Sequence, residues 1–160
     1  ALGMRARGFA RRPRTEPFID EFRAYPDVRG ALSGAEFAVL ALPLNKHTRN
    51  MIGYEELRAL RSDGVMVNVG RGGVVSKPDL IRFLRDNPDF TYATDVYWSG
   101  DISQDADLAA LPNVIATPWI AGAFGNPRVY LEMVRHAAEN VLRYLRGENL
   151  RNVVERSDYL

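Results

Sequence analysis

Apolar residues gather in five short runs along the chain, each rich in β-branched or aromatic residues. Several of these runs are continuously apolar rather than alternating, which is typical of strands covered on both faces of a sheet. We expect one strand in each of MRARGFA (4–10), FAVLALPL (37–44), VMVNVGR (65–71), TYATDVYW (91–98) and NVIATPW (113–119).

Helical patterns separate most of these strands. Helices are predicted over 53–63, over 76–87 with Ser76 as the N-cap, and over 126–147 with Asn126 as the N-cap. The apolar stripe of the last helix leaves His136 on the polar face, where we expect it to be solvated.

The alternation of strands and helices predicts an α/β fold, a doubly wound parallel sheet with right-handed crossovers. Ligands in such sheets bind at the carboxyl ends of the strands, and most of the unusual residues of the chain directly follow a predicted strand. We divide the chain into a nucleotide-binding portion, 1–147, and a carboxyl-terminal tail, 148–160.

Composition excludes several classes of function. The chain has 160 residues, 46% of them hydrophobic, with a net charge of +1, which argues against binding nucleic acid by charge alone. There is no cysteine, and His47 and His136 lie far apart, so we expect no thiolate chemistry and no metal site. No apolar run approaches the roughly 20 residues of a membrane span.

Arg71 stands between Gly70 and Gly72, directly after a strand that looks buried. A glycine on each side lets the backbone turn and approach its neighbours closely, so the arginine is suited to an anionic ligand. The alternative is a buried arginine paired with a carboxylate of the core.

Four motifs, LALPLNKHT, VNVGRGGVV, ATDVY and NVIATPWIAG, occur in the order and spacing that resemble the nucleotide-binding domain of the D-isomer-specific 2-hydroxyacid dehydrogenases. The resemblance implies that Arg71 is the catalytic arginine, which binds the carboxylate and carbonyl of a 2-oxo acid. It places Asp95 against the nicotinamide carboxamide, although an Asp at a strand end could equally cap a turn. The other cofactor contacts that it implies are Leu42, Pro43, Thr48, Val69, Gly70, Trp119 and Gly122.

Both members of the family's acid/base pair are replaced. Trp119 stands where the resemblance implies a histidine, and an indole has no basic lone pair. Gly100 stands where it implies a glutamate, and Asp101 would reach the site only if its loop shifted. His47 is the only other histidine near a strand end, and we expect it to be an exposed loop residue.

The position that contacts the cofactor ribose in this family differs as well. Family members that use NAD end their second strand with an acid that accepts a hydrogen bond from the ribose 2′-hydroxyl. Here Ala10 stands at that position, and Arg11 and Arg12 follow it. Two cations in place of a carboxylate favour NADP over NAD. The alternative is a pair of surface arginines in an arginine-rich protein.

The glycine-rich G-x-G-x-x-G loop and its strand do not occur in the sequence, which opens with ALG, a pattern that we interpret as the end of a helix. We therefore expect a Rossmann-like sheet without its first strand–helix unit. The resemblance implies a cytoplasmic NAD(P)-dependent oxidoreductase of small 2-oxo or 2-hydroxy acids, which is a homodimer in its full-length form. We expect this chain alone to be inactive or impaired in that activity. The alternatives are a non-catalytic module that responds to a dinucleotide, and an inactive fragment.

Overall fold

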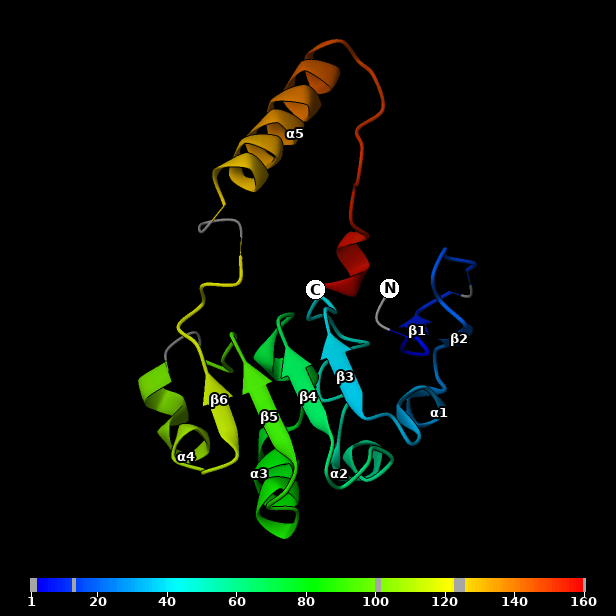
Figure 1. Cartoon of the computed structure of the whole chain (residues 1–160). Helices are drawn as coiled ribbons and strands as arrows, with labels where there is room; N and C mark the ends of the chain where they lie inside the picture. The colour runs from blue at the N-terminus through cyan, green and yellow to red at the C-terminus, as the bar shows by residue number, and fades with distance from the viewer. Residues whose placement is uncertain (1–2, 13, 100–101, 123–125, 160) are drawn as a thin grey trace.

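The computed structural model describes residues 3–12, 14–99, 102–122 and 126–159. All of its described strands pair in parallel, in one sheet of two strands and one of four (Figure 1). The predicted α/β fold is confirmed. The strands are β1 (Arg7–Ala10) and β2 (Glu21–Ala24) in the small sheet, and β3 (Phe37–Leu40), β4 (Val65–Asn68), β5 (Thr91–Thr94) and β6 (Val114–Ala116) in the large sheet.

The helices differ in how closely they follow the sequence pattern. They are α1 (Val28–Leu32), α2 (Tyr54–Leu57), α3 (Lys77–Asp86), α4 (Ala106–Ala109) and α5 (Pro127–Leu145), with single turns of 3-10 helix at η1 (Gly72–Val74), η2 (Ile102–Asp105) and η4 (Arg156–Asp158). The two helices predicted over 76–87 and 126–147 are confirmed. The helix predicted over 53–63 is wrong in length, because the backbone tightens after Leu57, where the N–H of Leu60 bonds to the carbonyl of Leu57.

The two predicted N-caps also differ. The side chain of Asn126 accepts hydrogen bonds from the backbone N–H groups of Arg128 and Val129, as a capping asparagine should. Ser76 occupies the N-cap position of α3, but its side chain makes no capping hydrogen bond.

One face of the large sheet carries the hydrophobic core. Side chains of β3, β4 and β5 pack there against α2 and α3. The fully buried residues of this core include Met66 of β4, Tyr92 of β5 and Phe83 of α3. On the opposite face Phe37 and Val39 of β3 are 62% and 67% exposed. The expectation that strands are covered on both faces therefore holds for only one face of β3.

Helix α5 extends away from the large sheet (Figure 1). None of its residues is buried, and the predicted apolar stripe, which includes Met133 and Val141, faces solvent. His136 is exposed as expected. Within the described segments no helix is both long enough and apolar enough to cross a membrane.

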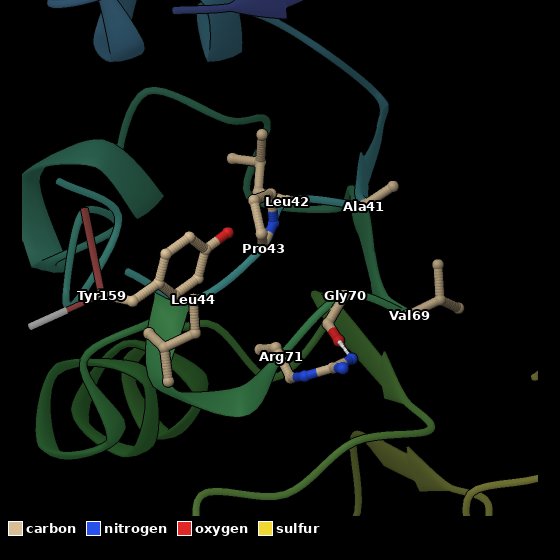
Figure 2. A pocket seen from close by; sticks show the side chains of 8 residues that line it. All are labelled: Ala41, Leu42, Pro43, Leu44, Val69, Gly70, Arg71 and Tyr159. Carbon is tan, nitrogen blue, oxygen red and sulfur yellow. Dashed lines mark hydrogen bonds between the residues drawn. The ribbon is translucent and has the colours of Figure 1, made fainter. Parts of the chain in front are cut away.

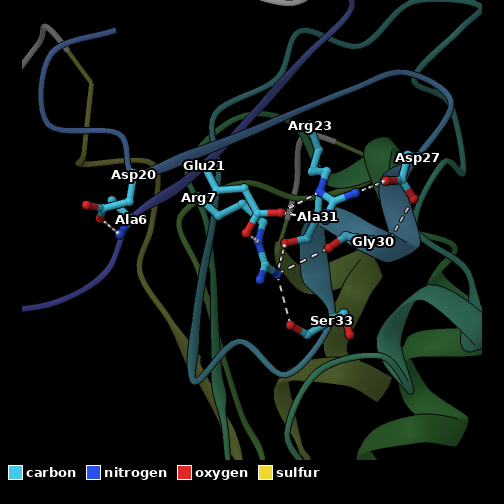
Figure 3. A network of polar contacts seen from close by, with 9 residues as sticks. All are labelled: Ala6, Arg7, Asp20, Glu21, Arg23, Asp27, Gly30, Ala31 and Ser33. Carbon is cyan, nitrogen blue, oxygen red and sulfur yellow. Dashed lines mark hydrogen bonds and ion pairs between the residues drawn. The ribbon is translucent and has the colours of Figure 1, made fainter. Parts of the chain in front are cut away.

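Among the described residues the two sheets do not join into one, because β1 pairs only with β2 and β3 pairs only with β4. Arg7 of β1 fastens the small sheet to α1, where its guanidinium donates to the carbonyls of Gly30, Ala31 and Ser33 (Figure 3). It also pairs with Glu21 of β2 at 3.1 Å. The carbonyls of Gly30, Ala31 and Ser33 lie at the carboxyl end of the short helix α1, where a cation is favoured.

Candidate functional site

A cavity of about 430 Å³ lies where β3 and β4 end, at the edge of the sheet where a parallel fold binds its ligands (Figure 2). One wall is the segment after β3 and the other is the segment after β4. Its lining residues are Ala41, Leu42, Pro43, Leu44, Val69, Gly70, Arg71 and Tyr159.

The glycines beside Arg71 are required by close backbone approach and not by an unusual backbone conformation. A Cβ atom on Gly70 would lie 2.7 Å from the carbonyl oxygen of Leu42, and one on Gly72 would lie 2.6 Å from the carbonyl carbon of Tyr97. No larger residue fits at either position unless the segment after β3 or the segment after β5 moves. The two glycines therefore let the chain around Arg71 pass tightly between the ends of β3 and β5.

Asn68 holds the same turn from inside the core. It is fully buried, and its amide nitrogen donates to the carbonyl of Arg71 at 3.1 Å and to the hydroxyl of Tyr92 at 3.2 Å. Its amide oxygen accepts the backbone N–H of Gly70 at 3.1 Å. A single satisfied amide thus fixes the backbone on both sides of the Cα of Arg71.

The side chain of Arg71 is exposed, and none of the described carboxylates forms an ion pair with it. Its guanidinium donates to the carbonyl of Gly70 at 2.7 Å and lies 6.0 Å from the ring of Trp119. This geometry differs from the alternative of a buried arginine paired with a core carboxylate. The remaining N–H groups of the planar guanidinium are available to a bidentate acceptor.

Trp119 has a left-handed backbone, with φ of 57°, which is costly for a bulky side chain and is concentrated at functional sites. The residue is 47% exposed, and its ring lies beside Arg71. The structure therefore brings together the two positions where the sequence predicts the substrate arginine and the replaced histidine. Gly100 and Asp101, the positions near the predicted glutamate, lie outside the described residues.

Asp95 organises the segment that carries Trp119. One of its carboxylate oxygens accepts from the Thr117 hydroxyl and from the N–H of Ile120, and the other accepts from the N–H of Ala121. Burial acts to raise the pKa of Asp95, but these hydrogen bonds outweigh burial and lower the pKa below its ordinary value. Asp95 thus caps this turn as an anion, and its predicted contact to a carboxamide stays a prediction.

The loop after β3 is held by its own side chains. The hydroxyl of Thr48 donates to the carbonyl of Pro43 at 2.6 Å, and it accepts the N–H of Asn45 at 2.9 Å. Thr48 therefore shapes the wall that Pro43 forms. At the end of the Trp119 segment, a Cβ atom on Gly122 would meet none of the described atoms within 4 Å, so their packing does not require a glycine there.

The ribose-end arginines have different surroundings. Arg11 pairs with Asp158 at 2.8 Å, and Asp158 also lies 3.3 Å from the imidazole of His47. Arg12 is exposed and has no ion pair among the described side chains. Sequence reasoning missed Asp158, and it missed Asn68 and Tyr159 as well.

Groups of side chains able to hold a metal ion are not found in the described part of the chain. The candidate site is therefore a cavity with an apolar wall at Leu42, Pro43 and Leu44. It contains an arginine beside an indole and without a described carboxylate partner, and Arg11 and Arg12 form a second cationic corner.

Comparison with protein families matches residues 1–121 to the family described as D-isomer specific 2-hydroxyacid dehydrogenase, NAD binding domain. Among curated relatives, glyoxylate/hydroxypyruvate reductase B of Enterobacter agglomerans is 34% identical over 130 residues, which cover 81% of this chain and 40% of that protein. Glyoxylate reductase of Aeropyrum pernix is 30% identical over 156 residues, which cover 98% of this chain and 46% of that protein. The chain thus spans less than half the length of these curated relatives.

Solved structures agree with this result. A putative formate dehydrogenase from Pyrobaculum aerophilum superposes with a TM-score of 0.90 at 43% identity, covering 99% of this chain and 52% of that chain. A D-isomer specific 2-hydroxyacid dehydrogenase from Xanthobacter autotrophicus Py2, solved with NADPH and MES, gives a TM-score of 0.84 at 31% identity, covering 98% of this chain and 64% of that chain.

Proposed function

Because this chain belongs to the D-isomer specific 2-hydroxyacid dehydrogenases, through their NAD binding domain, we propose that it forms the cofactor side of a site for small 2-oxo or 2-hydroxy acids. The observation that carries the proposal is Arg71, an exposed arginine without a described carboxylate partner at the end of a central strand. Its relatives include proteins named glyoxylate and hydroxypyruvate reductases, which favours a short 2-oxo acid as the substrate class.

In this proposal Arg71 binds the substrate. Its guanidinium donates hydrogen bonds to the substrate carboxylate and to the neighbouring carbonyl oxygen, so that negative charge developing on the carbonyl oxygen is stabilised. Asn68, Gly70 and Gly72 hold the backbone that aims the guanidinium.

A nicotinamide cofactor fits the chemistry of the cavity. Leu42, Pro43 and Val69 offer apolar walls to flat rings, and Arg11 with Arg12 offers cations to a phosphate. Bound there, the cofactor would supply or accept the hydride. The unpaired charge of Arg12 among the described side chains and the missing acid at Ala10 favour NADP over NAD as its form. The resemblance further leads us to propose a homodimer located in the cytoplasm.

One observation favours a second function, a module that binds a dinucleotide and a carboxylate without turning them over. Trp119 lies beside Arg71, and an indole N–H is neither a general acid nor a general base at neutral pH. Substrate binding and proton transfer are therefore separable in this site, and among the described residues only substrate binding has its side chain, that of Arg71.

Calorimetric titration tests the proposal directly. The protein is titrated with oxalate, a carboxylate analogue of a 2-oxo acid, in the presence and absence of NADPH. We expect oxalate to bind, and to bind more tightly when the cofactor is present. Failure to bind either compound would contradict the proposal, and binding of both without turnover of glyoxylate would select the second function.

A further inference from the structure

The last described residues of the chain lie against the cofactor side of the site. The backbone N–H of Lys46, in the loop after β3, donates to the carbonyl of Asp158 at 3.1 Å. Residues 156–158 form the 3-10 turn η4, which presents the side chains of Asp158 and Tyr159 to the strand ends. The tail is thus fixed at the same loop that walls the cavity.

Asp158 is held by two basic side chains from separate parts of the chain. Its carboxylate accepts from Arg11 at 2.8 Å and faces the imidazole of His47 at 3.3 Å, and its side chain is only 13% exposed. Burial acts to raise the pKa of Asp158, but the contacts with Arg11 and His47 outweigh it and lower that pKa. The group therefore stays an anion at neutral pH.

Tyr159 lies in the cavity itself. Figure 2 shows its ring beside Leu44 and Pro43, on the wall opposite to Arg71. An aromatic ring against apolar walls, next to an anion on an arginine, has the chemical character that suits the adenine and the ribose of a dinucleotide.

We propose that Asp158 is a further residue that affects cofactor specificity: it weakens the preference for NADP, because its carboxylate competes with a 2′-phosphate for Arg11. Strand β1 ends at Ala10 without an acid, and Asp158 of the tail brings a carboxylate to Arg11, the residue that follows Ala10. This carboxylate repels a phosphate, but it accepts a hydrogen bond from a 2′-hydroxyl. The inference rests on the proposed function, since it assumes that a dinucleotide binds at these strand ends.

The consequence is a division of roles between three charged residues. Arg11 and Arg12 attract a 2′-phosphate, and Asp158 opposes it by neutralising Arg11. Asp158→Asn keeps the size of the side chain and removes its charge. It should therefore strengthen the binding of a 2′-phosphorylated nucleotide, by about tenfold or more, and leave a nucleotide without that phosphate unchanged or slightly weakened.

The experiment uses adenosine 2′,5′-bisphosphate and adenosine 5′-monophosphate as probes, titrated calorimetrically into the unmutated protein, Asp158→Asn and Glu155→Gln. Glu155 is an exposed acid of the same tail, so its variant controls for net charge. We expect the ratio of the two affinities to shift toward the bisphosphate only in Asp158→Asn. A thermal melt of each variant shows that it is folded.

Four other results are distinguishable. Equal changes for both probes, or equal shifts in both variants, would overturn the role of Asp158 and leave the proposed cofactor site standing. A lower melting temperature for Asp158→Asn with an unchanged affinity ratio would assign Asp158 a purely structural role, which also overturns the inference. If the unmutated protein binds neither probe nor NADPH, the proposed cofactor site itself is wrong, and the inference fails with it.

Discussion

The guanidinium carbon of Arg71 lies 6.0 Å from the centre of the Trp119 ring, although the two residues follow different strands with β5 between them. A cation above an exposed indole gains roughly 0.5–1 kcal/mol. This contact steadies the arginine at the mouth of the cavity. It also places a group that cannot transfer a proton beside the group proposed to bind the substrate.

Turnover of 2-oxo acids should consequently be poor. A positioned general acid contributes roughly 10²- to 10⁴-fold, and we expect a rate lower by that factor than in an enzyme with a histidine at position 119. Trp119→His alone should restore little, because Gly100 offers no carboxylate to orient an imidazole. Initial rates against pH test this, with Trp119→Phe as the control that should match the unmutated protein. Ordinary turnover with a pH limb typical of histidine would show that another group has taken the role.

Arg71→Ala should abolish the binding of oxalate. Each charged hydrogen bond contributes roughly 1.5–3 kcal/mol, so losing one bond costs at least about tenfold in affinity. Arg71→Lys keeps the positive charge but loses the planar guanidinium, so its affinity for oxalate should lie between those of the unmutated protein and Arg71→Ala. Calorimetry measures these affinities, and Arg85→Ala, an exposed arginine near the end of α3, is the matched control. Unchanged affinity in Arg71→Ala would remove the residue from the site.

The cationic corner predicts a preference for NADPH over NADH. We expect the double variant Arg11→Ala, Arg12→Ala to lose most of its affinity for NADPH and to keep its affinity for NADH, because only NADPH carries the extra phosphate. Fluorescence titration with both cofactors measures the preference. Equal or tighter binding of NADH by the unmutated protein would count against the assignment of these two arginines.

Much of the sheet could be predicted because buried parallel strands leave a strong local pattern. The run 65–71 indicates β4, and the shared edge of a parallel sheet then places the ends of β4 and β6 close together. That argument is enough to bring Arg71 near Trp119. In contrast β2 (EFRA), α1 (VRGAL) and α4 (ADLA) mix apolar with charged or small residues over four or five positions, so no continuous apolar run marks them.

The remaining residues of the site depend on contacts that no local pattern encodes. Asp158 is 147 positions from Arg11, and neither residue carries a signal for the other. Asn68 stands within an apolar run, and only the turn at Gly70 and Arg71 shows that its amide has partners. The open side of α5 was equally hidden, because an apolar stripe predicts burial without saying what covers it.

Asn68 provides a test of how the substrate arginine is held. Asn68→Ala removes the acceptor of the Gly70 N–H and the donor to the Tyr92 hydroxyl, and it leaves the carbonyl of Arg71 with the N–H of Val74 at 3.3 Å; the change should lower the free energy of unfolding by roughly 1–3 kcal/mol. We also expect weaker binding of oxalate, since the turn that aims Arg71 is loosened.

Asn113→Ala is the matched control for this variant. Asn113 donates to the carbonyls of Leu84, Asn87 and Phe90, away from Arg71, so its loss should destabilise the protein without changing the affinity for oxalate. Urea unfolding and calorimetry on both variants separate stability from binding. If oxalate affinity is the same in the two variants, Asn68 does not position Arg71.

Asp95 predicts a pH-dependent contribution to stability. Its pKa is lowered in the folded protein, so the stabilisation is fully present above its unfolded pKa of about 3.9 and is lost as the pH falls through the lower folded pKa. Asp95→Asn replaces one accepting oxygen by an amide that faces a backbone N–H, and should cost roughly 1–3 kcal/mol at pH 7. The difference between the variant and the unmutated protein should shrink below pH 4. Urea unfolding at pH 7 and pH 3 measures it, with the exposed Asp89→Asn as the control. A difference of the same size at both pH values would mean that the charge of Asp95 does not hold the Trp119 segment.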